Sequence, residues 1–348
     1  MKKYIALFLV LALTAVLFAG CAGTPVVYYT NCTCPAGGTA PQQPAVDVGE
    51  GSVKTGLAIL TSVAKSKEGA AEYDVTIVAV TVNDEGIITD CVIDSVGTTV
   101  AFGTDGVITS DLNAEILTKN ELGDAYNMVT YGGAKYEWYV QAEALANFAV
   151  GKTVDQLKNG AIDESGYAVD ADLASMATIN LYSYVSGIEA AVNNATHLGA
   201  QAGEELKLAV INSAKSSTSA TAEKDGTAQL DCDVVALTVK DGVITSCVID
   251  SVQAKVSFNA SGAITSDVSA PVQTKNQLGA AYNMVAWGGA KAEWNEQAAS
   301  FASYVTGKTA QQVAGIAVAE GKPADADLSA SVTIAIGGFQ ALIAKALG

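Results

Sequence analysis

Two stretches of this chain are nearly identical: Thr118–Tyr139 reads TKNELGDAYNMVTYGGAKYEWY and Thr274–Asn295 reads TKNQLGAAYNMVAWGGAKAEWN. Sixteen of their 22 positions hold the same residue, at a constant offset of 156 residues. Shorter repeats keep this offset, namely CVIDSV at 91–96 and 247–252, and GKT at 151–153 and 307–309. Solenoid repeats have periods of only about 20–50 residues. The sequence therefore predicts a duplicated domain with two equivalent sites.

The duplication also sets the expected domain boundaries. We expect repeat 1 at residues 51–192, an inter-repeat linker at 193–203 and repeat 2 at 204–348. Each repeat is about 140–145 residues long, which is a usual size for a single domain.

Within each repeat, the pattern predicts antiparallel strands followed by helices. In repeat 2, residues 229–239 and 243–252 are rich in Val and Leu, and the Asp-Gly pair between them is a hairpin turn signal. Further strands are expected at 254–259 and 263–266, and the spacing of Leu206–Lys215 predicts a helix before the hairpin. The corresponding strands of repeat 1 are expected at 75–82, 87–96 and 98–102. Each repeat thus contains a meander of three or four strands.

A helix with one apolar stripe is expected after the strands of each repeat. The stripe consists of Trp138, Ala142, Leu145 and Ala149 in repeat 1 and of Trp294, Ala298, Phe301 and Val305 in repeat 2. Gly151 and Gly307 should end these helices in a left-handed conformation. Thr153 and Thr309, each with a glutamine three residues later, predict capping boxes for the next helices.

These signals indicate that the repeated Gly-Lys-Thr ends one helix and begins the next. A phosphate-binding loop, GxxxxGK[ST], needs a first glycine, and Ala146 and Ala302 stand there instead. We therefore expect the α+β class: two tandem copies of a small antiparallel sheet with helices packed on one face.

Residues 1–21 have the pattern of a bacterial lipoprotein signal peptide. Lys2 and Lys3 precede an apolar run, and small residues precede Cys21, which we expect to be the lipidated first residue of the mature chain. An uncleaved membrane anchor is the alternative, although the run is short for a span of about 20 residues. Residues 22–50 are rich in Pro and Gly and should form a tether. We expect an extracytoplasmic protein that is lipid-anchored to the bacterial cell membrane.

The charge and the histidine content exclude several functions. The formal net charge is −17, with 36 acidic residues against 19 lysines and no arginine. Phosphate backbones are bound by clustered Lys and Arg, so we expect no nucleic-acid partner. His197 is the only histidine and lies in the linker, which excludes His-based triads and metal sites built on several histidines.

The cysteines of the repeats are expected to be buried and unbonded. Cys91 and Cys247 occupy equivalent strand positions and resemble small apolar residues in a core. The offset of 156 matches Cys232 with Thr76. The expected hairpin register places Ala236 opposite Cys247, which excludes a disulfide between Cys232 and Cys247.

The order of elements resembles a known family. The strand pair VALTVKDGVITSCVID at 235–250 is followed by a helix, then by an Asp-containing turn and a last helix, and the last helix is preceded by SMAT at 175–178 or ASVT at 330–333. The chain resembles the extracytoplasmic FMN-binding domain family, whose hallmark is S-G-A-T before the final helix, often after an aspartate. In that family the threonine carries FMN through a phosphoester bond. Here methionine (Met176) or serine (Ser331) stands in place of the glycine.

The resemblance implies Thr178 and Thr333 as FMN attachment candidates, with Asp170 and Asp325 as the preceding acids. It also implies an extracytoplasmic redox partner. From the residues alone, a threonine at a helix N-terminus faces unpaired N–H groups that favour a phosphate. The alternative is that both threonines only cap a helix or lie in a strand.

A second candidate site is a glycine-rich loop beside an aromatic residue. It consists of Tyr131, Gly132 and Gly133 in repeat 1 and of Trp287, Gly288 and Gly289 in repeat 2. An aromatic ring next to two glycines can stack on a flat ligand, and the alternative is a tight turn with a half-buried ring. The Asp-x-Asp pairs at 170–172 and 325–327 lack the calcium-loop pattern, so we expect solvated turn carboxylates and no metal site.

Two functional hypotheses follow from the sequence. The first is a membrane-anchored extracytoplasmic lipoprotein with duplicated FMN-binding-like domains that binds flavin or transfers electrons. The alternative is a non-catalytic cell-surface binding or interaction protein without flavin. No nucleophile, base and orienting acid form a recognisable set, so we expect at most an electron-transfer flavoprotein rather than an enzyme.

Overall fold

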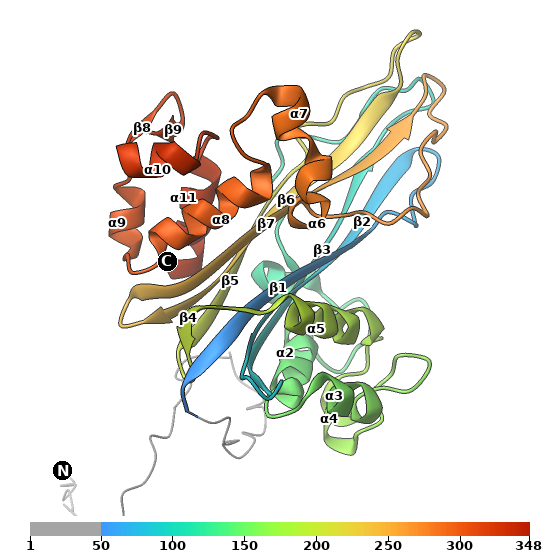
Figure 1. Ribbon diagram of the computed structural model, residues 1–348. Helices are drawn as coiled ribbons and strands as arrows, with labels where there is room; N and C mark the ends of the chain where they lie inside the picture. Colours follow the sequence, from blue (N-terminus) through green and yellow to red (C-terminus); the bar gives the residue numbers. More distant parts are fainter. Residues whose placement is uncertain (1–49) are drawn as a thin grey trace, which may run out of the picture. The chain divides into compact units, whose positions relative to one another are not determined.

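The computed structural model describes residues 50–348, which belong to one compact unit (Figure 1). The expected signal peptide, the lipidation site Cys21 and the tether up to residue 49 lie outside the described residues. Among the described helices, none is long and apolar enough to cross a membrane.

Repeat 1 begins with three strands and continues with helices. Its strands are β1 (Ser52–Ser62), β2 (Ala70–Val82) and β3 (Ile88–Ala101). Its helices are α1 (Lys119–Leu122), the 3-10 turn η1 (Gly123–Tyr126), α2 (Trp138–Ala149), α3 (Val154–Gly160), α4 (Ala171–Met176) and α5 (Tyr182–Asn194). The strand β4 (Thr196–Gln201) follows in the expected linker.

Repeat 2 has the same order of main elements and adds the short helix α7 and the strand pair β8–β9. Its strands are β5 (Glu205–Ser213), β6 (Gly226–Lys240) and β7 (Val243–Phe258), with a two-residue pair β8 (Val318–Ala319) and β9 (Lys322–Pro323). Its helices are α6 (Lys275–Leu278), the 3-10 turn η2 (Gly279–Tyr282), α7 (Met284–Gly288), α8 (Trp294–Val305), α9 (Ala310–Ala314), α10 (Ala326–Ser331) and α11 (Gly337–Leu347).

Each repeat forms its own antiparallel sheet. The strand orders are β3-β2-β1-β4 in repeat 1 and β5-β6-β7 in repeat 2. β4 pairs with β1, where Lys54 lies opposite His197. The inter-repeat segment is therefore a fourth strand of the first sheet.

The two sheets pack face to face, and each carries the helices of its own repeat on its outer face (Figure 1). Tyr73 and Ile77 of β2 share an apolar core with Leu230 and Val234 of β6. The neighbouring residues on the same strands point outward, for example Val78 toward the helices of repeat 1. The expected α+β class, with helices on one face of each sheet, is confirmed.

One expected helix is a strand. Residues 206–213 belong to β5, although Leu206, Ala209 and Val210 have helical spacing. Leu206 and Val210 face the other sheet, whereas Ala209 faces the helices of repeat 2. A strand that is buried on both faces carries apolar residues on both, so its spacing fits a helix as well as a strand.

The two long strands are continuous where the sequence predicted breaks. β3 passes through Gly97 and β7 passes through Gln253 without leaving the ladder, since these residues pair with Asp74 and Asp231 respectively. The expected strand at 263–266 is not formed, and Ile264 makes only an isolated bridge to the end of β7.

The β6–β7 register differs by one residue from the expected one. Leu237 rather than Ala236 lies opposite Cys247, because the ladder shifts by one residue near the turn. Cys232 pairs with Val252. The two cysteines are therefore far apart in the ladder, and the three cysteines within the described residues are all buried and unbonded.

The same shift changes one match between the repeats. Val80 lies opposite the first-repeat cysteine as Leu237 lies opposite the second, so the offset in this strand is 157 residues. Cys232 therefore corresponds to Val75, and the expected match with Thr76 is wrong. Val75 and Cys232 both belong to the core between the sheets.

The helices that follow the strands form as predicted. Trp138 and Trp294 are buried at the start of α2 and α8. The helices are followed by left-handed glycines, Gly151 (φ 79°) and Gly307 (φ 82°). Capping boxes start α3 and α9 at the expected threonines.

Equivalent residues of the two repeats contact each other at the far end of the hairpins. The rings of Phe102 and Phe258 stack with centroids 3.9 Å apart and an interplanar angle of 5°. A Cβ on Gly106 would lie 2.9 Å from the Cβ of Ala220, so a glycine is required there. Contacts between equivalent positions are typical of two-fold dimers. The chain is thus a covalently linked pseudo-dimer.

Phe258→Ala is expected to lower the free energy of unfolding by about 3–5 kcal/mol, because it leaves a cavity between the sheets. Phe102→Ala should have a similar effect, and the double substitution should cost less than the sum because the rings touch. Urea titration measures these changes. Tyr182→Ala removes an exposed ring and serves as the control, with an expected change below about 0.5 kcal/mol. Equal losses at Phe258 and Tyr182 would contradict the packing.

Candidate functional site

Within each repeat, the duplicated CVIDSV strand segment contacts the duplicated TKN segment. The Asp94 carboxylate, from CVIDSV, accepts hydrogen bonds from the backbone N–H of Ser95 (2.7 Å) and of Asn120 (3.2 Å) in the TKN segment. The Asn120 side chain donates to the Ile93 carbonyl at 2.9 Å. The same bonds join Asp250, Ser251, Asn276 and Ile249 in repeat 2. A strand aspartate therefore holds the start of the loop that leads to the candidate site.

The two aspartates are buried, and burial raises the pKa of Asp94 and of Asp250 to about 6. The hydroxyls of Thr118 and Thr274 and the backbone N–H groups favour the ionised form. Desolvation disfavours a carboxylate charge more strongly than these bonds favour it.

A lysine that lies between two aromatic rings holds the next part of each loop. The Lys119 ammonium lies 5.3 Å from the Tyr126 ring and 5.2 Å from the Trp138 ring. Lys275 lies in the same way between Tyr282 (5.4 Å) and Trp294 (4.7 Å). Burial lowers the pKa of both lysines. These cation–π contacts fix the 3-10 turn against the first turn of the following helix.

A buried glutamate holds the loop that follows. The Glu137 carboxylate accepts from the backbone N–H of Met128 (2.8 Å) and of Val129 (3.0 Å). Glu293 accepts from Met284 (2.8 Å) and Val285 (3.1 Å). Bonds to a charged acceptor are stronger than neutral ones. The loop is therefore well fixed at its base in both repeats.

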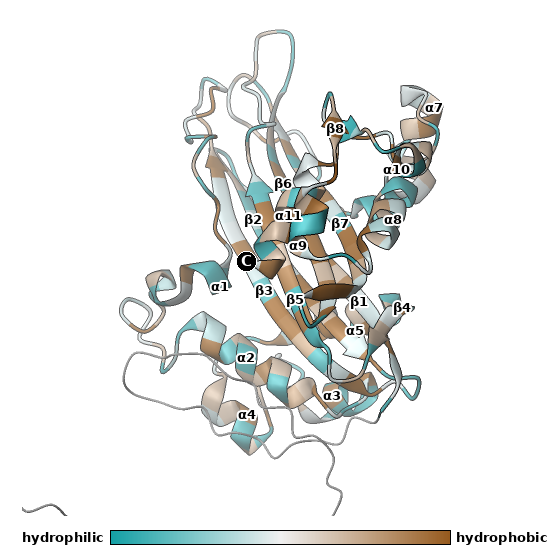
Figure 2. Cartoon of the chain, turned by 90° about the vertical axis from the view of Figure 1, so that its left-hand side faces the viewer, coloured by the Kyte–Doolittle hydropathy of each residue, from teal (hydrophilic) through white to brown (hydrophobic). Residues whose placement is uncertain are grey.

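The tips of these loops are exposed aromatic side chains. Tyr131 is 85% exposed and Trp287 is 88% exposed. Val129 and Val285, two residues before them, are also exposed. Figure 2 places α1, which leads into the Tyr131 loop, and α7, which carries Trp287, on opposite sides of the paired sheets. The expected alternative of a half-buried ring is wrong for both.

The loop glycines serve the shape of the loop itself. Gly133 (φ 66°) and Gly289 (φ 63°) are left-handed. A Cβ on Gly132 would lie 2.6 Å from the Met128 carbonyl oxygen, so a larger residue at this position would clash with the loop's own backbone.

Thr178 and Thr333 do not lie at a helix N-terminus or in a strand. Thr178 is in the segment between α4 and α5, and α5 begins only at Tyr182 with Leu181 as its N-cap. The Gln141 side-chain oxygen accepts from the Thr178 N–H (2.8 Å) and hydroxyl (3.2 Å). The expected capping role is wrong, because a buried glutamine on α2 positions this segment.

Repeat 2 repeats this arrangement. The Gln297 oxygen accepts from the Thr333 N–H at 2.7 Å and from its hydroxyl at 3.1 Å. The Thr178 hydroxyl is on an exposed residue and that of Thr333 on a half-buried one, so neither is sealed in the interior. Neither threonine lines the pocket between β3 and β5 or the one formed by residues 221–225 and 259–261.

The aspartates that precede the threonines cap short helices. Asp170 accepts from the N–H groups of Asp172 and Leu173 at the start of α4. Asp325 does the same for Asp327 and Leu328 at the start of α10. Their role in the structure is therefore N-capping.

In repeat 1, the aromatic loop and the threonine segment are neighbours. The Lys135 ammonium donates to the Ser175 carbonyl at 3.0 Å, three residues before Thr178. Gln141 also donates to the Tyr136 carbonyl at 2.8 Å. The structure thus brings together two candidate segments that the sequence treated separately.

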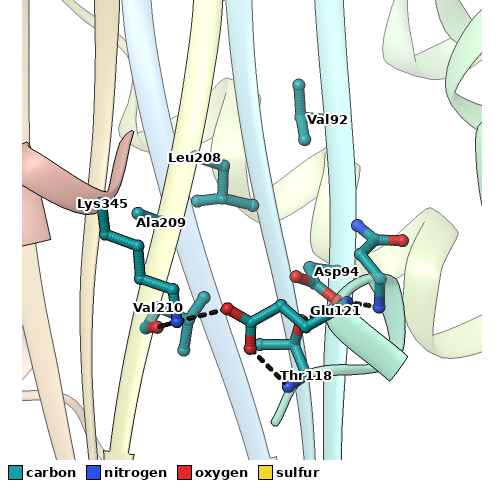
Figure 3. Close-up of a pocket in the computed structure, with 9 residues that line it drawn as sticks. Val92, Asp94, Thr118, Glu121, Leu208, Ala209, Val210 and Lys345 are labelled. Atoms are coloured by element: carbon teal, nitrogen blue, oxygen red, sulfur yellow. Dashed lines mark hydrogen bonds and ion pairs between the residues drawn. The ribbon is translucent and has the colours of Figure 1, made fainter. Parts of the chain in front are cut away.

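A pocket of about 280 Å³ lies between β3 and β5, where the repeats meet (Figure 3). Lys345 on α11 crosses it to form an ion pair with Glu121 on α1, and it donates to the Val210 carbonyl at 2.6 Å. Glu121 also accepts from the Thr118 N–H at 2.8 Å. Lys345 and Glu121 pair with each other across this pocket, and Asp94 is paired with backbone N–H groups, so the pocket joins the repeats.

Sequence reasoning missed the residues that hold the site in place. Glu137 and Gln141, with their counterparts Glu293 and Gln297, are identical in both copies at an offset of 156. That identity was the available signal. Their partners are backbone groups, which no sequence motif reveals.

No family model, no curated protein and no solved structure matches this chain. Within residues 50–348, no group of three or more His, Cys, Asp or Glu side chains could hold a metal ion. The resemblance to the FMN-binding domain family stays a prediction, and the function has to be argued from the site.

The raised pKa values of Asp94 and Asp250 predict a pH effect on stability. A carboxyl group whose pKa is higher in the folded state binds its proton more tightly there. The free energy of unfolding therefore decreases as the pH rises from about 4 to about 7. Each aspartate should contribute on the order of 1–3 kcal/mol to this loss.

The double variant Asp94→Asn/Asp250→Asn keeps an acceptor oxygen and removes the titration. Urea unfolding of the native chain at about pH 5 and about pH 7.5 should show greater stability at the lower pH, and the variant should show a smaller difference. An unchanged pH dependence in the variant would rule out these two groups as its source.

Proposed function

We propose that this chain is an extracytoplasmic, membrane-tethered binding protein in which each repeat presents a rigid loop with an exposed aromatic tip. The observation that carries the proposal is the exposure of Tyr131 and Trp287 at equivalent positions of loops that are otherwise firmly held. The lipoprotein signal that ends at Cys21 supports the extracytoplasmic location and the lipid anchor.

The stiffness of the loop favours binding. A large aromatic side chain costs free energy when it is left in water, and its burial on a partner recovers that cost. Because Glu137 and Glu293 already order the backbone at the base of each loop, little further conformational entropy is lost when a partner binds. The absence of a recognisable catalytic set in the sequence fits binding rather than catalysis.

Oxidative footprinting tests this role without knowledge of the partner. We expect hydroxyl radicals to oxidise Trp287 and Tyr131 several-fold more slowly in intact producing cells than in the purified protein, because bound aromatic residues are shielded from water. Tyr167 and Tyr182, which are exposed outside the loops, are the matched controls and should be oxidised equally in both samples. Equal oxidation of the two loop residues in cells and in solution would contradict the proposal.

FMN carriage is a second candidate, and one observation favours it for repeat 1. Thr178 is exposed, and the Lys135 ammonium lies at the carbonyl of Ser175 nearby, so a cation is available to a phosphate. Thr333 fits less well, because it is more enclosed and its segment keeps only the threonine of the family's motif. An FMN would supply electron transfer, with Thr178 and Lys135 holding its phosphate.

The flavin candidate has a direct test. If it is correct, the natively expressed protein is yellow, and the peptide with Thr178 has the added mass of FMN. Thr178→Ala should remove both signals, and Thr333→Ala should leave the Thr178 peptide unchanged. A colourless protein with unmodified peptides at both threonines would exclude covalent FMN.

A further inference from the structure

The two aromatic loops differ in their charged surroundings. Residues 268–292 around Trp287 contain two lysines, Lys275 and Lys291, and no acidic residue. The equivalent residues 112–136 contain three acids. Glu115, Glu121 and Asp124 of repeat 1 are replaced by Pro271, Gln277 and Ala280 in repeat 2. In a chain with a net charge of −17, one of the two equivalent segments therefore lacks these carboxylates, while Asp231 and Asp233 of β6 lie near Lys275 and Tyr282 at its base.

The side chains of the Trp287 loop offer a polar ligand only one hydrogen-bond donor. Residues 284–290 read Met-Val-Ala-Trp-Gly-Gly-Ala, in which only the indole N–H can donate. The equivalent loop carries the hydroxyls of Thr130 and Tyr131. A sugar or a polar peptide would leave its own groups unpaired against the Trp287 loop, so an apolar partner is favoured.

Most backbone N–H groups of the Trp287 loop are already paired. The N–H groups of Met284 and Val285 donate to the Glu293 carboxylate. The Trp287 N–H donates to the Asn283 carbonyl at 3.1 Å, and that of Ala290 donates to the Met284 carbonyl at 3.1 Å. Unpaired backbone groups are what prevents most loops from entering lipid. This single helical turn therefore exposes few unpaired N–H groups to the apolar boundary of a bilayer.

We propose that the Trp287 loop inserts into the interfacial region of a lipid bilayer, a proposal that rests on the binding role of the loops. Trp is enriched where acyl chains meet headgroups, and the exposed Lys291 beside the loop is attracted to anionic lipids there. The lipid anchor at Cys21 supplies attachment, and the loop supplies a second contact that orients the folded part. The helix α1, which leads into the Tyr131 loop, lies on the opposite side of the sheets from α7 (Figure 2).

Intrinsic fluorescence can report this insertion. The chain has three tryptophans, and Trp138 and Trp294 are 2% and 7% exposed, so a solvent-dependent change reports Trp287. The chain from Ala22 onward keeps every described residue and lacks the lipid-modified cysteine. We expect its emission to shift to shorter wavelength when phosphatidylcholine vesicles containing phosphatidylglycerol are added, and we expect quenching by brominated acyl chains.

Vesicle flotation measures the affinity of the variants. Trp287→Ala should lower the vesicle partition coefficient about tenfold, as expected for the loss of one large buried side chain. Tyr131→Ala is the matched control at the equivalent position and should change it by less than about twofold. Gln277→Glu/Ala280→Asp restores the acids of repeat 1 and should weaken binding to the anionic vesicles while Trp287 remains.

The outcomes separate this inference from the proposed function. If Trp287 is protected in cells but the chain neither floats with vesicles nor changes its emission, the bilayer contact is wrong and the loop binds another partner. Equal losses for Trp287→Ala and Tyr131→Ala would also overturn the assignment to one loop. If Trp287 is not protected in cells, the binding role fails as well.

Discussion

The structure depends on the burial of two sheets against each other. Along β2, Tyr73, Val75 and Ile77 face the second sheet, while Val78 and Val80 face the helices. A sheet that is apolar on both faces has to be covered on both, and the helices of its own repeat cover only one. Each repeat therefore uses the other as its second cover, which is why the duplicated domains form one unit. The fixed relation between the two loops follows from this.

The two copies have kept the residues that hold the loops and have changed the residues around the tips. Identical pairs hold the base of each loop: Asp94 and Asp250, Lys119 and Lys275, Glu137 and Glu293, and Gln141 and Gln297. Each of these side chains contacts backbone groups or rings that are themselves shared by both repeats. The tips carry Tyr131 or Trp287, and the three acids that precede the first tip in the sequence have no counterpart in repeat 2. The scaffold is thus symmetric, whereas its surface is not.

The hydrogen bonds that hold the loops distinguish their exposed rings from other exposed apolar residues. Single exposed apolar residues are common on protein surfaces and need no explanation. Here a carboxyl side chain, Glu137 or Glu293, is buried in each repeat and accepts hydrogen bonds from two backbone N–H groups. Burying a carboxylate is costly unless it is well hydrogen-bonded. The bonds from the loop backbone meet this condition, and they fix the loops that carry the exposed rings. The threonine segments are held in a comparable way by a glutamine, but their hydroxyls are already hydrogen-bonded.

The sequence by itself determined the duplication, the α2 and α8 helices, their glycine ends and the capping boxes at Thr153 and Thr309. These features depend on residues within a few positions of one another, so local patterns are sufficient to predict them. Only the tertiary structure decided that residues 206–213 form a strand, that Leu237 faces Cys247, and that Thr178 is held by Gln141. Burial on both faces removes the alternation that marks a strand, a bulge shifts the register, and contacts over tens of residues leave no local pattern. The full exposure of Tyr131 and Trp287 belongs to the same class, because it is set by where the rest of the chain packs.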